Sequence, residues 1–201
     1  MNNNILVSDR ILIRPILKGD TDAIHEYASD KSITMMMFLP NETREETESF
    51  VEYVVSEWNK DTTNDREYVI VYEGNVIGGI NLEYNDTKDI CEIGWIVHKN
   101  YRNKGIATEV AKLLIEYAFN NLLVHKVTSY CDSANAASQK VMIKIGMTLV
   151  DNSGTRFYPK TGVTSGEYLY EITKEEYYQQ KDNGDSSKIL VCGGDKDEDI
   201  S

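Results

Sequence analysis

Long hydrophobic runs are missing from this 201-residue sequence, and so is a basic, apolar leader at its start. A membrane-spanning helix needs about 20 consecutive apolar residues, and a secretory signal needs a positively charged start followed by an apolar stretch. The opening MNNNILVSDR has neither property. We therefore expect a cytoplasmic protein with no membrane segment.

Cysteine is also scarce. The three cysteines, Cys91, Cys131 and Cys192, lie far apart in the sequence. This spacing matches neither a disulfide framework nor a metal-ligand pattern. His98 and His125 do not show the spacing of zinc ligands either. We expect a reducing compartment and no metal.

Basic residues are outnumbered, with 21 Lys and Arg against 33 Asp and Glu, a net charge of −12. That balance argues against nucleic acid as the main partner, because phosphate backbones bind to basic surfaces. It favours the approach of cationic small molecules or basic peptides. The length and an apolar fraction of 41% fit one globular domain with a sizeable core.

The two common nucleotide-binding fingerprints, GxGxxG and GxxxxGK[ST], are absent as well. A different small-residue turn occurs in the stretch CEIGWIVHKNYRNKGIAT, residues 91–108, where Arg102, Gly105 and Ala107 form R-x-x-G-x-A. An apolar strand pattern precedes this turn and an amphipathic helix pattern follows it. The first N–H groups of a helix lack intrahelical partners, and the helix dipole attracts anions there. The stretch therefore predicts an anion site.

Strand and helix patterns alternate along most of the chain, which indicates an α/β fold. Strands are expected within residues 5–16, 67–72, 76–84, 91–98, 126–132, 147–150 and 157–172, with polar breaks at 152–154 and 159–166. Helices are expected within residues 20–29, 43–59, 106–118, 134–145 and 174–180. The last segment, residues 181–201, is rich in charge and glycine and has no aromatic residue. We expect one domain over residues 1–180, followed by an acidic, disordered tail.

A second motif, N-x-x-S-x7-G, is formed by Asn135, Ser138 and Gly146. With the first motif and the segment SDRILIRP, residues 8–15, it resembles the GNAT acetyltransferases, most of all their RimJ/RimL-type branch. The resemblance covers about residues 8–172. It implies the GNAT fold, a mixed twisted sheet with helices on both faces. Two central strands, here residues 91–98 and 126–132, would splay apart at one end.

The resemblance also implies an enzyme that moves the acetyl group of acetyl-CoA directly to a primary amine. The acceptor would be a small molecule, a polyamine or a protein N-terminus. The strand at Ile96 and Val97 would bond the pantetheine and the thioester, the turn would hold the pyrophosphate, Asn135 would bond the pantetheine amide, and Ser138 would lie near the nucleotide. The implied cofactor-binding residues are Ile96, Val97, Arg102, Asn103, Lys104, Gly105, Ile106, Ala107, Thr108, Asn135 and Ser138.

Glu92 is the candidate general base, because it is a carboxylate in an apolar strand beside the implied cleft. The alternative is a solvated glutamate at the edge of a strand. Glu109 lies in the first turn of the pyrophosphate helix, where stabilisation by the dipole is favoured over catalysis. Relatives outside the branch have a tyrosine at the position of Met142 that protonates the leaving thiolate, so the resemblance does not identify a general acid in this chain. For Cys131, a small buried residue is favoured over an acetyl carrier.

The function of the site as a whole has a second interpretation. A non-catalytic module that binds acyl-CoA as a sensor or scaffold is the competing function, and a homodimer stays open. Asn135 also fits a helix N-cap, which is compatible with ligand binding. The segments expected to line the acceptor, residues 33–40 and 151–166, contain no motif that identifies it.

Overall fold

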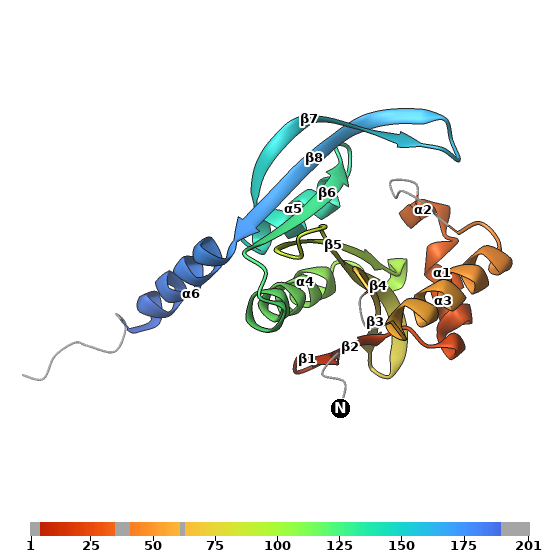
Figure 1. The fold of residues 1–201 in the computed structure, drawn as a ribbon, viewed down its shortest axis with the longest axis horizontal. Coiled ribbons are helices and arrows are strands. Elements are labelled where there is room, and N and C mark those ends of the chain that lie inside the picture. Colours follow the sequence, from red (N-terminus) through yellow and green to blue (C-terminus); the bar gives the residue numbers. More distant parts are fainter. Residues whose placement is uncertain (1–4, 35–40, 61–62, 190–201) are drawn as a thin grey trace, which may run out of the picture.

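The computed structural model describes residues 5–34, 41–60 and 63–189, which form a mixed eight-stranded sheet flanked by helices (Figure 1). The strand order is β1-β2-β3-β4-β5-β6-β8-β7. The strands are β1 (Leu6–Val7), β2 (Ile11–Pro15), β3 (Asp65–Tyr72), β4 (Asn75–Tyr84), β5 (Ile90–Val97), β6 (Lys126–Asp132), β7 (Thr148–Tyr158) and β8 (Val163–Thr173). The helices are α1 (Thr21–Ala28), α2 (Lys31–Thr34), α3 (Arg44–Trp58), α4 (Ile106–Tyr117), α5 (Ala136–Lys144) and α6 (Lys174–Ile189). The expected α/β class is confirmed.

Helices cover both faces of the sheet (Figure 1). Alternation along β3 decides which residue faces which layer, since successive side chains of a strand point to opposite faces. Val69 packs with buried residues of α1 and α3, whereas Tyr68 and Ile70 join the larger core against α4. No helix among the described residues is long and apolar enough to cross a bilayer.

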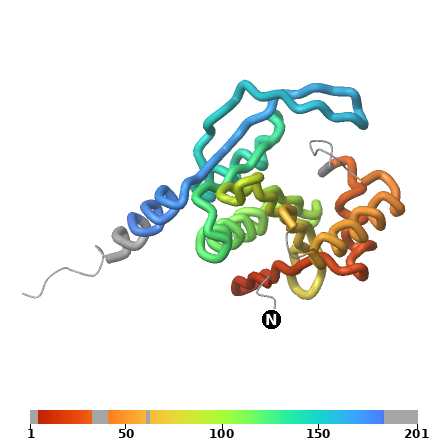
Figure 2. Tube along the Cα trace, in the orientation of Figure 1, coloured from red at the N-terminus to blue at the C-terminus, as the bar shows by residue number. Residues whose placement is uncertain are grey.

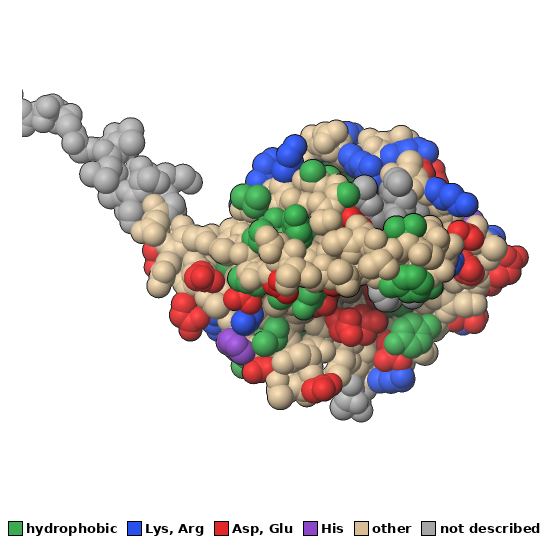
Figure 3. All heavy atoms as spheres, turned by 90° about the horizontal axis from the view of Figure 1, so that it is seen from above, with side chains coloured by type: hydrophobic (Ala, Val, Ile, Leu, Met, Phe, Trp, Pro, Cys, Tyr) green, Lys and Arg blue, Asp and Glu red, His purple; other side chains and the backbone are tan. Residues whose placement is uncertain are grey.

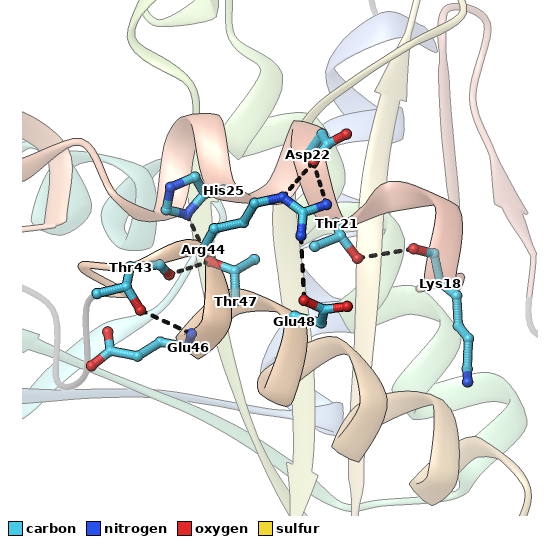
Figure 4. A network of polar contacts seen from close by, with 9 residues as sticks. All are labelled: Lys18, Thr21, Asp22, His25, Thr43, Arg44, Glu46, Thr47 and Glu48. Carbon is cyan, nitrogen blue, oxygen red and sulfur yellow. Dashed lines mark hydrogen bonds and ion pairs between the residues drawn. The ribbon is translucent and has the colours of Figure 1, made fainter.

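Polar contacts join α1 to α3 (Figure 4). The Thr43 hydroxyl accepts a hydrogen bond from the Glu46 N–H at 3.1 Å and so caps α3. Arg44 Nη2 lies 2.9 Å from Asp22 Oδ1, and Thr47 Oγ1 lies 2.9 Å from His25 Nδ1. These contacts hold the two helices together on one face of the sheet.

Two strand predictions differ from the structure. The single strand expected over residues 5–16 is a short pair, β1 and β2, because the Ser8 hydroxyl accepts the Ile11 N–H in a turn between them. The predicted break at residues 152–154 lies inside β7, where the pairing with β8 shifts register instead of ending. The two strands therefore form one long hairpin that arches over the sheet (Figure 2).

The hairpin reaches the helical layer at its tip. Lys160, in the turn between β7 and β8, lies with its Nζ 2.9 Å from Glu46 Oε2 at the start of α3. Segments more than 100 residues apart thus meet above the sheet (Figure 2). Of the expected acceptor-lining segment 33–40, residues 35–40 lie outside the described residues.

The last helix, α6, extends to Ile189 and so continues past the boundary expected at Lys181. Lys174 Nζ donates to the Phe119 carbonyl at 2.9 Å, and the Tyr177 ring lies 5.4 Å from the Phe119 ring. Lys181 Nζ ion-pairs with Glu116 Oε1 at 2.8 Å. The beginning of the predicted tail is therefore helical, and residues 190–201 lie outside the described residues.

Candidate active site

The central strands β5 and β6 separate at one end, as the GNAT resemblance implies. Their parallel pairing covers residues 90–92 of β5 and ends at the pair Glu92–Thr128. Beyond that point the Ser129 hydroxyl still donates to the Ile93 carbonyl at 2.8 Å. Ile96 then faces a cavity of about 1050 Å³ that both strands line. The separation leaves one edge of β5 free to pair with an extended ligand.

The turn before α4 lies at the end of β5. Gly105 adopts a left-handed φ of +78°, which a residue with a side chain adopts only with strain. Asn103 is also left-handed, with φ of +62°. The Arg102 Nε lies 3.4 Å from the Val97 carbonyl, so its side chain bends back to β5. Residues 102–105 are exposed, whereas Ile106 buries its side chain.

The second motif lies across the cavity, at the start of α5. The Asn135 carboxamide oxygen accepts the Ser138 N–H at 3.1 Å, so Asn135 is the N-cap that its position in the sequence also fits. Asn135 and Ser138 both line the cavity, and Met142 lines it one turn further along with its side chain buried. The structure thus places the second motif on the cavity, whereas the first motif follows the end of β5, whose residues 92–96 line the cavity.

An acidic wall forms the other end of the same cavity. Its carboxylates come from four strands, and one arginine lies among them: Asp65, Glu67, Glu83, Glu92, Glu167 and Arg156. The guanidinium Nη2 of Arg156 lies 2.5 Å from Glu167 Oε1. Acidic side chains also gather in the middle of the face seen in Figure 3. The cavity is therefore negative at this end and suits a cation.

Burial shifts these carboxyls toward their neutral form. Desolvation, with a smaller contribution from Glu83, raises the pKa of Glu92 to about 7. Desolvation and the neighbouring carboxylates raise the pKa of Glu67 to about 8 and that of Asp65 to about 6. The Asp65 Oδ1 is buried without a hydrogen-bond partner among the described residues. A bound cation would stabilise the charged form of each of these groups.

Two polar side chains lie on the sheet between the acidic wall and Ile96. Asn81 sits over Gly94, because a Cβ at Gly94 would come 2.7 Å from its Oδ1. The Tyr27 hydroxyl lies over Gly79 beside Ile96, 3.2 Å from where a Cβ would stand. Gly94 is midway along β5 between Glu92 and Ile96, whose Cα atoms are about 13 Å apart at strand spacing. A proton can therefore pass between Ile96 and Glu92 only through intervening polar groups or water.

The thiol of Cys131 does not suit covalent transfer. Cys131 lines the cavity and is 3% exposed. Burial raises the pKa of its thiol to about 11, and a protonated thiol is a poor nucleophile. This favours the small buried cysteine of the sequence interpretation.

The sequence interpretation missed most of the acidic wall and both residues over the glycines. A signal was present: Asp65 and Glu67 are two positions apart at the start of a strand whose remainder is apolar or aromatic, and Asn81 and Glu83 repeat that spacing in its hairpin partner. Alternate residues share a face. Their register, Glu67 opposite Asn81 and Asp65 opposite Glu83, places all four on the cavity side.

Comparison with known proteins agrees with this geometry. A family model described as an acetyltransferase (GNAT) domain matches residues 10–148. YnaD of Bacillus subtilis, an N-acetyltransferase, is 32% identical over 175 residues, 86% of this chain and 98% of that protein. Spermidine N(1)-acetyltransferase of Escherichia coli K12 is 26% identical over 141 residues, 69% of this chain and 73% of that protein.

A solved structure supports the fold. Spermidine N-acetyltransferase from Vibrio cholerae, in complex with CoA and spermine, superposes with a TM-score of 0.73 over 85% of this chain and 99% of that chain. At 20% identity this likeness concerns the fold alone. With the family match over residues 10–148, the 32% identity to YnaD and the splayed strands, this chain belongs to the GNAT acetyltransferase family.

Proposed function

We propose that this enzyme transfers the acetyl group of acetyl-CoA to a primary amine of a small polycation such as a polyamine. The observation that carries the proposal is the acidic wall, which lines the same cavity as Ile96, where β5 and β6 have separated. An acceptor with two or more nitrogen atoms can bind the acidic wall through one ammonium group while another nitrogen lies near Ile96, where the thioester is proposed to bind. The similarity to spermidine N(1)-acetyltransferase of Escherichia coli supports this acceptor class.

The residues around the separated ends of β5 and β6 fit acetyl-CoA. Ile96 and Val97 would offer their backbone to the pantetheine and the thioester, and Asn135 and Ser138 would approach from α5. Residues 102–108 would hold the pyrophosphate through backbone N–H groups and the α4 dipole. The exposed turn and the left-handed Gly105 are compatible with that contact.

Glu92 is our proposed proton acceptor. An alkylammonium with a pKa near 10 is almost wholly protonated at neutral pH, so the site has to remove a proton before attack. The proton would pass through water along Asn81 to Glu92. The free amine attacks the thioester carbon, an N–H of β5 stabilises the oxyanion, and the C–S bond breaks to release CoA. No acyl-enzyme is needed.

A panel of amines tests this proposal, with acetyl-CoA as donor and free thiol release as readout. We expect kcat/KM for spermidine and diamines to exceed that for monoamines and for peptides with a free N-terminus by about tenfold or more. Preference for a peptide would contradict the acceptor class. CoA binding without turnover on any amine would favour a sensor or scaffold.

A further inference from the structure

Arg10, which lies near the N-terminus of the chain, contacts the turn before α4. Its Nε donates to Glu109 Oε2 at 2.8 Å and its Nη2 lies 2.7 Å from the same oxygen. The Nη2 also donates to the Lys104 carbonyl at 2.9 Å. One guanidinium therefore bridges the first turn of α4 and the peptide that joins Lys104 to Gly105.

That hydrogen bond orients the peptide plane. In a trans peptide the C=O and N–H groups point in opposite directions, and no cis peptide bond occurs among the described residues. With the Lys104 carbonyl turned toward Arg10, the N–H of Gly105 points away from Arg10. The exposed turn on that side is where the pyrophosphate is proposed to bind.

Glu109 creates a problem that Arg10 relieves. A carboxylate in the first turn of α4 would repel two phosphates bound at the same helix end. Both of its oxygens are engaged, since Oε1 accepts the Ser8 hydroxyl at 2.5 Å and Oε2 accepts Arg10. The charge of Glu109 is thus compensated on the side away from the ligand.

Aromatic rings complete the support. The Arg10 guanidinium carbon lies 5.9 Å from the Tyr72 ring centre, and Tyr72 pairs with Ile11 in the adjoining strand. The Lys104 Nζ lies 5.0 Å from the Tyr101 ring and 5.9 Å from the Tyr72 ring. These contacts fix the position of Arg10 and the path of the turn.

We infer that Arg10 is a positioning residue for the pyrophosphate of CoA: it aims the Gly105 N–H at the ligand and compensates the Glu109 carboxylate. The inference rests on the proposed function, because it presumes that the turn binds CoA. It assigns a role to Arg10 and Ser8 in the segment SDRILIRP. The side chains of Arg10 and Glu109 are 42% and 25% exposed, so their ion pair by itself adds little stability.

Calorimetry with CoA and steady-state kinetics test this inference at one fixed ionic strength. Arg10→Ala should raise the Kd for CoA by about thirtyfold, because the Gly105 N–H would no longer be held toward the charged phosphate and its hydrogen bond would be lost. Its kcat at saturating acetyl-CoA should stay within about twofold of wild type, because Arg10 touches no reacting atom. A purely structural role would lower the melting temperature and leave the Kd unchanged.

Three further variants separate charge from geometry. Arg10→Lys keeps the charge but lacks the planar fork, so its Kd should remain about fivefold above wild type. Glu109→Gln should bind CoA at least as tightly as wild type. The double variant Arg10→Ala/Glu109→Gln should bind about threefold more tightly than Arg10→Ala, since no uncompensated carboxylate remains. If Arg10→Ala folds poorly, the Kd of Arg10→Lys carries the test instead.

Arg44→Ala is the matched control, because Arg44 also forms exposed ion pairs but belongs to α3 and not to the surroundings of the turn before α4. Its Kd for CoA should match wild type. An Arg10→Ala Kd within about threefold of wild type would overturn the inference, as would wild-type affinity in Arg10→Lys. Wild-type enzyme that binds no CoA at all would instead refute the proposed function.

Discussion

At the scale of single residues, burial raises the pKa of Glu92 toward a value that suits proton transfer. The same burial makes ionisation of its neighbours unfavourable to folding. Glu92, Glu67 and Asp65 all have pKa values raised by desolvation. A carboxyl with a pKa near the working pH is an effective proton acceptor. The same shift means that ionising the group opposes folding. The acidic wall is therefore expected to trade stability for the binding of a cationic acceptor.

Glu92→Gln tests the base. Below a pKa of about 7 the Glu92 carboxyl holds its proton and cannot accept another, so wild-type kcat/KM should fall as the pH drops through 7. The variant should lose this limb, and its rate at pH 7 should be about a hundredfold lower. Pre-steady-state and steady-state rates over pH 6–9, roughly the window around that pKa, measure both effects.

Glu83→Gln is the matched variant, because Glu83 lies opposite Glu92 in the register but is exposed. It should raise the KM for the polyamine and leave kcat close to wild type. A Glu92→Gln enzyme that keeps more than about half its rate at pH 7 would leave proton removal to water or to the amine's own equilibrium.

Glu67→Gln tests the cost to folding. The pKa of Glu67 is raised to about 8, so between the ordinary glutamate pKa and 8 the unfolded chain releases a proton that the folded chain keeps. Stability therefore falls as the pH rises through this window. Gln cannot ionise, so the variant should gain roughly 1 kcal/mol or more relative to wild type between pH 5 and pH 8.

Thermal melts over that pH range give the measurement. Glu52→Gln, at an exposed position of α3, serves as the control and should follow the wild-type curve. Parallel curves for Glu67→Gln and wild type would show that Glu67 ionises equally in both states.

At the scale of elements, the turn before α4 is proposed to bind the pyrophosphate through its exposed backbone. Gly105 has φ of +78°, and a Cβ there meets nothing closer than Arg10 Nη2 at 3.7 Å. The position is thus open in space and restricted in conformation. Phosphate binding at a helix N-terminus needs close approach of the ligand to this backbone.

Gly105→Asp should therefore weaken CoA binding by about a hundredfold or more, because its carboxylate occupies the place of the phosphates. Gly105→Asn is the matched control. Both side chains tolerate a left-handed φ better than other residues, but only Asp adds a charge. Calorimetry should find a much smaller loss for Asn. Equal losses for the two variants would point to shape or strain instead of charge.

At the scale of the whole molecule, α6 is fastened to the body by its first two turns. The contacts to Phe119 come from Lys174 and Tyr177, and Gln180 donates to the Gly146 carbonyl at 3.1 Å. The Lys181–Glu116 pair is half exposed on both sides. The stability of this helix therefore depends on residues 174–180.

Two truncations test that division. Removal of residues 181–201 takes away the exposed Lys181–Glu116 ion pair and should lower the melting temperature by no more than about 3 °C. Removal of residues 174–201 also uncovers Phe119, which is fully buried, and should lower it by about 8 °C or more. A large loss with the shorter truncation would show that the segment after Gln180 also stabilises the body.

Local patterns in the sequence determined the elements, the two motifs and the family resemblance. Alternation and helix periodicity depend on which face is buried, so β6, α3 and α4 appear at or near their predicted bounds. The Thr43 cap and the Gly105 turn are likewise local, since each depends on the backbone within a few residues. What failed was also local in form: a polar stretch in β7 shifts register where a loop was expected.

Only the tertiary structure decided what faces the cavity. Asp65, Glu67, Glu83 and Glu92 are charged residues on three strands, and register alone places them on one surface. Arg10 and Glu109 are 99 positions apart, and their contact exists because α4 packs against β1 and β2 of the sheet. Burial, pKa and pairing depend on neighbours distant in the chain, and a linear pattern carries no distance between them.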